Sequence, residues 1–129
     1  MSERSDRTSR QVLEDHLAKR KAGLLEEDLA ENFTEDVVLL TSDGVFRGHE
    51  SVRRLARQLA TDFPDNGFEY RNVLVEGELG FLEWSATSEC ASVHDGADSY
   101  LIRHGKIVAQ TIHYTVKRNR AERHERRAD

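Results

Sequence analysis

The sequence predicts a single α+β domain in which a cone-shaped, curved antiparallel sheet wraps around three helices from the N-terminal half. In the first half, apolar residues recur every three or four positions, as in helices; in the second, closely spaced turn residues separate strand-like segments. Helices that precede an antiparallel sheet are typical of the α+β class. The 129 residues suit one domain. We expect a flexible N-terminus over 1–7, the domain over 8–116 and a charged, disordered tail over 117–129.

Three helices are expected. The first begins with the capping box T-S-R-Q at Thr8 and ends at Gly23, a residue suited to the left-handed cap. The second is short and is expected to bury Leu25, Leu29, Ala30 and Phe33. The third begins near Gly48, carries a clean apolar stripe and is stopped by Pro64.

Six strands are expected around these helices. They are predicted over residues 37–41, 45–47, 68–75, 81–93, 97–103 and 107–116. Asp43-Gly44, Asp95-Gly96 and His104-Gly105 are interpreted as turns between them. Turns this close together favour an antiparallel meander, and a curled sheet closed by helices encloses a cavity suited to a small ligand.

Charge and composition limit the classes of protein to which the chain can belong. The formal net charge is −5, to which the last thirteen residues contribute +3 and the rest of the chain −8, so the body of the domain is acidic and nucleic-acid binding is not expected. The tail is interpreted as a solvated extension, with contact to RNA or an acidic partner as the alternative. Cys90 is the only cysteine, and no segment resembles a membrane span or a signal peptide. We therefore expect a cytoplasmic protein.

Four segments carry a family resemblance: A-G at 22–23, N-F-T-E-D-V-V at 32–38, G-x-F-R-G-H-E-S-V at 44–52 and G-K-I-V-A-Q-T-I-H-Y-T-V at 105–116. They resemble the nuclear transport factor 2-like (NTF2-like) superfamily. Within it the chain is similar to the SnoaL-like, polyketide cyclase-like branch, which also contains ketosteroid isomerase. The resemblance implies the cone fold and a homodimer formed through the sheet. It leaves the function open, because the superfamily includes isomerases, cyclases, dehydratases, epoxide hydrolases and binding modules.

Alternation along the strands groups the side chains that can face the cavity. Matched to ketosteroid isomerase-like sequences, the inward sets are Asp98, Tyr100 and Ile102; Gln110, Ile112 and Tyr114; and Leu82, Trp84 and Ala86. A slip of one residue would turn Ser99, Leu101, Thr111 and His113 inward instead. Ligand contacts are expected from Trp84, Tyr100, Gln110, Ile112 and Thr41.

Asp98 and His16 are the candidate catalytic residues, with Tyr114 assisting. Asp98 matches the position where the isomerase resemblance implies a carboxylic acid kept protonated by apolar surroundings; this pattern is the established one for that isomerase. The alternative is a solvated aspartate near a turn. His16 stands where the resemblance implies a hydrogen-bonding tyrosine, and its alternative is a boundary histidine on an amphipathic helix.

Thr41 stands where the isomerase has its general base, so steroid isomerisation is not expected. The six histidines lack the spacing of metal ligands, and neither a metal nor a cofactor is expected.

Two functions remain open. The first is an enzyme of the cyclase or isomerase kind acting on a small, mostly apolar carbonyl-bearing or ring-bearing molecule. The second is a non-catalytic module that binds a small molecule or a protein.

Overall fold

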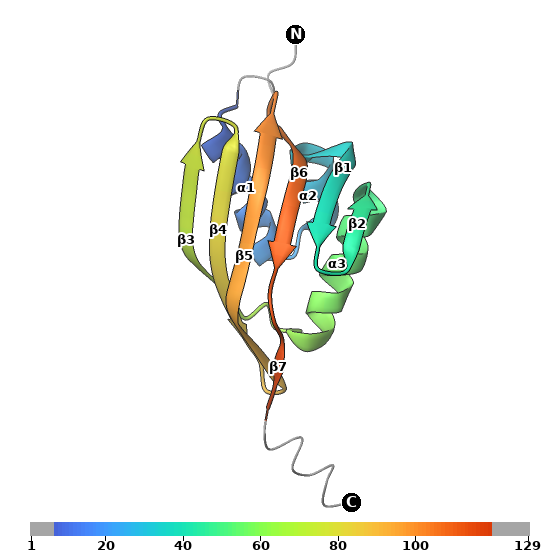
Figure 1. The fold of residues 1–129 in the computed structure, drawn as a ribbon, viewed down its shortest axis with the longest axis vertical. Coiled ribbons are helices and arrows are strands. Elements are labelled where there is room, and N and C mark those ends of the chain that lie inside the picture. Colours follow the sequence, from blue (N-terminus) through green and yellow to red (C-terminus); the bar gives the residue numbers. More distant parts are fainter. Residues whose placement is uncertain (1–6, 120–129) are drawn as a thin grey trace, which may run out of the picture.

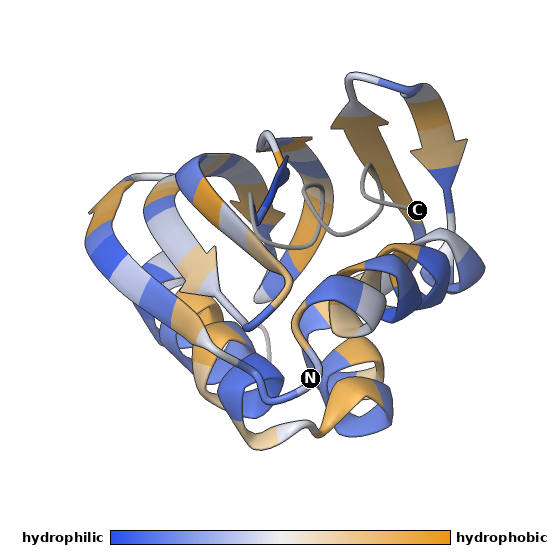
Figure 2. Ribbon diagram, turned by 90° about the horizontal axis from the view of Figure 1, so that it is seen from below, coloured by the Kyte–Doolittle hydropathy of each residue, from blue (hydrophilic) through white to orange (hydrophobic). Residues whose placement is uncertain are grey.

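The computed structural model describes residues 7–119 and confirms the predicted fold class. Three helices, α1 (Ser9–Ala22), α2 (Leu25–Asn32) and α3 (His49–Asp62), lie on one side of a curved sheet (Figure 1). The sheet curls over them, as the view from below shows (Figure 2). This arrangement creates one apolar interior between the concave face of the sheet and the helices.

The sheet is mixed. Its strands are β1 (Phe33–Thr41), β2 (Gly44–Arg47), β3 (Phe68–Glu76), β4 (Leu79–Thr87), β5 (Ala91–Arg103), β6 (Lys106–His113) and β7 (Lys117–Arg118). The order is β2-β1-β6-β5-β4-β3, and β7 pairs with β5. The expected antiparallel meander runs from β3 to β6. The pair of β1 and β6 is parallel, and β1 lies between β6 and the edge strand β2.

The predicted turn at Asp95-Gly96 is wrong. Both residues lie inside β5, and the chain reverses earlier, where the Ser88 hydroxyl accepts hydrogen bonds from the amides of Cys90 and Ala91. The glycine at 96 has another purpose. A Cβ atom there would come within 2.4 Å of the Trp84 ring, so Gly96 makes room for the indole on the neighbouring strand.

The predicted start and end of α1 are confirmed. Thr8 Oγ1 accepts from the Gln11 amide at 3.1 Å, Gln11 Oε1 accepts from the Thr8 amide at 2.8 Å, and Gly23 has a left-handed φ of 77°. The expected inward face of α2 is partly wrong. Ala30 is exposed and Phe33 opens β1, whereas Asp28 and Asn32 are buried with Leu29.

The C-terminal part also differs from expectation. The last long strand ends at His113, and Lys117 and Arg118 form β7 against Ala91 and Ser92. Residues 1–6 and 120–129, which make up most of the expected flexible ends, lie outside the described residues. None of the described helices is both long enough and apolar enough to cross a membrane.

Candidate functional site

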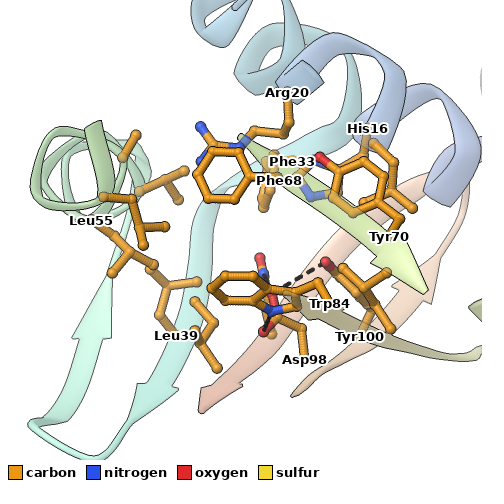
Figure 3. A pocket seen from close by; sticks show the side chains of 17 residues that line it. His16, Arg20, Phe33, Leu39, Leu55, Phe68, Tyr70, Trp84, Asp98 and Tyr100 are labelled. Carbon is orange, nitrogen blue, oxygen red and sulfur yellow. Dashed lines mark hydrogen bonds between the residues drawn. The ribbon is translucent and has the colours of Figure 1, made fainter. Parts of the chain in front are cut away.

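A small, mostly apolar cavity lies between the concave face of the sheet and helices α1 and α3 (Figure 3). Its volume is about 70 Å³, and it is lined by His16, Leu17, Arg20, Phe33, Leu39, Val52, Leu55, Ala56, Leu59, Phe68, Tyr70, Leu82, Trp84, Asp98, Tyr100, Gln110 and Ile112. An engineered cavity of about 150 Å³ binds benzene. A ring therefore enters this cavity only if lining side chains move or if it extends into the neighbouring space.

Two further hollows adjoin the central cavity. The second, of about 190 Å³, shares Leu39, Leu55 and Ile112 with it and is more polar. The third, of about 220 Å³, shares Arg20, Ala56, Leu59 and Phe68 with it. α3 contributes side chains to all three, so the three hollows lie along this helix.

Asp98 is the only carboxyl group that lines the central cavity in the described part of the chain. It lies on β5 and is 8% exposed. Trp84 Nε1 donates to its Oδ1 at 3.1 Å, and Oδ2 accepts from Gln110 Nε2 at 3.1 Å and from the Tyr100 hydroxyl at 3.4 Å. Three adjacent strands thus supply the donors, because Trp84 belongs to β4 and Gln110 to β6.

Burial raises the pKa of Asp98 to about 6 from an ordinary value of 3.8. Desolvation penalises the ionised carboxylate, whereas the hydrogen bonds from Trp84 and Gln110, the charge of His16 and the hydrogen bond from Tyr100 favour it and limit the rise. Burial also raises the pKa of Tyr100 well above its ordinary value, so this phenol stays a donor. A carboxyl group that titrates near neutral pH can both accept and return a proton.

The His16 ring forms a hydrogen bond with a buried carboxyl group. Its Nδ1 lies 2.8 Å from Oδ2 of Asp28, which is fully buried on α2. Asn32 Nδ2 donates to the other oxygen of Asp28 at 2.8 Å. Since a carboxylate can only accept, Nδ1 carries a proton and Nε2 is the ring nitrogen that can act in the cavity. The ring edge packs near Tyr100, with centroids 5.6 Å apart.

Removing the carboxyl group of Asp28 is expected to destabilise the domain. Asp28→Ala removes the acceptor of His16 Nδ1 and one of the two acceptors of Asn32 Nδ2, which also donates to Asp15. We expect the free energy of unfolding to fall by roughly 2 kcal/mol. Urea unfolding followed by circular dichroism measures it. Glu27→Ala, at an exposed position of the same helix, is the control and should stay within about 0.5 kcal/mol of the unmodified chain. Equal losses in both variants would contradict the importance of the buried contact.

The structure brings most of the predicted site residues together. Asp98, His16, Trp84, Tyr100, Gln110 and Ile112 line the central cavity. The register is therefore the predicted one, and the slipped alternative is excluded for these strands. Tyr114 and Thr41 do not line the central cavity: both line the second hollow, and the Tyr114 ring packs against Trp84 with ring centroids 5.4 Å apart.

The sequence interpretation missed Asp28. A signal was present, because Leu25, Asp28, Leu29 and Asn32 follow the spacing of one helical face. Arg20 and Tyr70 were also missed as lining residues. Within residues 7–119, no group of three or more His, Cys, Asp or Glu side chains is placed to hold a metal ion.

The family model described as a SnoaL-like domain matches residues 11–110. No curated protein matches the chain.

Similar folds occur among solved structures. A de novo designed protein with a curved β-sheet is 24% identical with a TM-score of 0.69, covering 89% of this chain and 88% of its own. An NTF2-like protein of unknown function from Burkholderia xenovorans LB400 is 21% identical with a TM-score of 0.65, covering 83% and 82%. A candidate ketosteroid isomerase from Kribbella flavida DSM 17836 is 15% identical with a TM-score of 0.68, covering 83% and 77%. These likenesses establish the fold, which a designed protein shares with natural ones.

Proposed function

This chain belongs to the SnoaL-like domain family, and from that premise we propose that it is an enzyme that moves a proton on a small, mostly apolar carbonyl compound. The observation that carries the proposal is Asp98, a buried carboxyl group with a pKa of about 6 in a mostly apolar cavity. Perturbed carboxyl groups in apolar pockets are typical of acid–base sites. The fold shared with a candidate ketosteroid isomerase is consistent with this chemistry.

The proposed step is removal of a proton from the carbon next to the carbonyl group. The ionised Asp98 accepts the proton, the C–H bond breaks, and its electron pair forms the carbon–carbon double bond of an enolate. The negative charge moves to the carbonyl oxygen, where His16 stabilises it when its ring carries a proton on Nε2 as well as on Nδ1. Asp98 then returns the proton to the same or another carbon atom. Isomerisation needs this return, whereas cyclisation uses the enolate to attack a second carbonyl group.

A non-catalytic binding module is the second candidate. It is favoured by the three hydrogen bonds that already occupy the carboxyl oxygens of Asp98. It is also favoured by Thr41, which lines the second hollow and stands where the resemblance to ketosteroid isomerase implies a base. In this case the same cavity would hold a small molecule without changing it.

Hydrogen–deuterium exchange of simple ketones tests the proposal without the natural substrate. Cyclohexanone and phenylacetone are incubated with the protein in D₂O, and loss of their α-protons is followed by NMR. We expect the protein to accelerate the exchange, and Asp98→Asn to lower the acceleration by about 100-fold because the amide cannot accept the proton.

The control is Asp95→Asn on the same strand, since Asp95 is exposed and bonded to Thr115 rather than to the cavity. Binding of the ketones without accelerated exchange would contradict the enzyme proposal and support the binding module. Equal exchange with the two variants would exclude Asp98 as the base.

A further inference from the structure

Arg20 lines the central cavity from the last turn of α1, one turn after His16, and both side chains extend from the helix toward the cavity (Figure 3). Its basic neighbours have partners: Lys19 Nζ lies 2.7 Å from Asp15, and Lys21 donates to the Phe68 carbonyl at 2.8 Å. Within residues 7–119, by contrast, the Arg20 guanidinium has no carboxylate partner. A positive charge thus lines the mostly apolar cavity that also contains Asp98, and no described carboxylate forms an ion pair with it.

The burial of Arg20 distinguishes it from the other arginines that lack a carboxylate partner. Arg47, Arg54 and Arg71 also have no carboxylate partner in the described part of the chain, but all three are exposed to solvent. Arg20 is half-buried, and it lines the third hollow as well as the central cavity. A partly desolvated guanidinium without a counter-ion is costly unless a ligand supplies one.

We propose that Arg20 binds a carboxylate of the ligand, so that the ligand is an apolar or aromatic monocarboxylic acid. The inference rests on the proposed binding of an apolar molecule in the central cavity. A guanidinium pairs with a carboxylate through two parallel hydrogen bonds. One unpaired guanidinium balances one negative charge, which fits a carboxylate better than a phosphate.

The charges of the cavity also orient such an acid. Asp98 carries negative charge when ionised and repels the carboxylate, whereas Arg20 attracts it. The apolar body therefore extends from Arg20 past the Phe68 and Tyr70 rings toward Trp84 and Asp98, all of which line the central cavity. In this pose the reacting carbonyl group lies at the end of the ligand distant from the carboxylate.

The helix dipole gives a simpler role for Arg20. Basic residues near a helix C-terminus are favourable, and Arg20 lies in the last turn of α1 with Lys19 and Lys21. A role limited to the dipole predicts that loss of the charge changes stability but not the choice of ligand. The two roles therefore differ in their effect on binding.

Fluorescence of Trp84 gives a direct readout, because it is the only tryptophan and lines the cavity. Phenylacetate, phenylpropionate and phenylbutyrate are titrated against their neutral amides, and calorimetry confirms each dissociation constant. We expect at least one acid to bind roughly tenfold more tightly than its amide. The preference should disappear in Arg20→Gln and be partly kept in Arg20→Lys. It should persist in Arg71→Gln, which makes the same charge change at an exposed position of β3.

The outcomes separate this inference from the proposed function. If amides bind as tightly as acids, or if the preference survives in Arg20→Gln, the inference is wrong and the proposed apolar cavity stands. If neither series binds, the inference fails together with the cavity on which the proposed function rests. If Arg71→Gln loses the preference for acids as much as Arg20→Gln does, the preference comes from the net charge of the protein, and the proposed role of Arg20 is also wrong.

Discussion

Replacing Trp84 with alanine is expected to lower the free energy of unfolding by about 3–5 kcal/mol. The indole is 5% exposed and packs against Phe68 and Tyr114, with ring centroids 5.8 Å and 5.4 Å apart. It also lies over Gly96, where no side chain can fill the space that the substitution leaves. The variant therefore loses the buried surface of a large aromatic ring and gains a cavity beside Asp98.

Urea unfolding followed by circular dichroism measures the loss, since the variant has no tryptophan to report by fluorescence. Trp84→Phe separates packing from hydrogen bonding, because it keeps a ring but removes the Nε1 donor to Asp98. We expect its loss to be smaller than that of alanine. Leu74→Ala is the control, because Leu74 is 54% exposed and should change stability by less than about 1 kcal/mol. An unchanged stability of Trp84→Ala would show that the indole does not fill the interior.

Local patterns were sufficient to predict much of the fold and the cavity-facing residues. The capping box at Thr8 and the left-handed glycine at Gly23 depend on neighbours within a few residues, and both ends of α1 are as predicted. Strand alternation likewise placed Asp98 and Gln110 on one face, because a period of two leaves only two choices. The resemblance to known isomerase sequences chose between them.

Local patterns could not predict the features that depend on residues distant in the sequence. Gly96 follows an aspartate, a pattern typical of a turn. It is instead a strand residue whose missing side chain leaves room for the Trp84 ring on the neighbouring strand β4, twelve residues earlier in the sequence. The parallel pairing of β1 with β6 joins segments about seventy residues apart. Asp28 occupies an inward helical position where hydrophobicity alone predicts an apolar residue. The His16 imidazole on α1 and the Asn32 amide one turn later explain why a carboxyl group is buried there.

The stability of the domain is expected to depend on pH through Asp98. Its pKa is about 6 in the folded protein and near the ordinary 3.8 when unfolded. The folded state therefore binds the proton more tightly than the unfolded state does. The resulting stabilisation is fully present below about pH 4 and is lost as the pH rises through about 6. The pKa difference corresponds to about 3 kcal/mol.

Asp98→Asn has no such proton to lose. We expect the stability of this variant relative to the unmodified chain to rise by about 3 kcal/mol between roughly pH 4 and pH 7, and to stay constant above that range. Urea unfolding at a series of pH values measures the difference. Any constant offset from the altered hydrogen bonds to Trp84 and Gln110 does not affect this pH dependence.

Asp95→Asn gives a control of opposite sign. Hydrogen bonds from the backbone and side chain of Thr115 lower the pKa of Asp95, so its stabilisation is present at higher pH and lost as the pH falls. The relative stability of this variant should therefore fall as the pH rises to about 5 and stay nearly constant above that, with no rise between roughly pH 4 and pH 7. If the Asp98→Asn difference is instead flat from roughly pH 4 to pH 7, Asp98 titrates alike in the folded and unfolded states. The apolar cavity would then not hold the proton of Asp98, and the argument that this carboxyl group is tuned for proton transfer near neutral pH would fail.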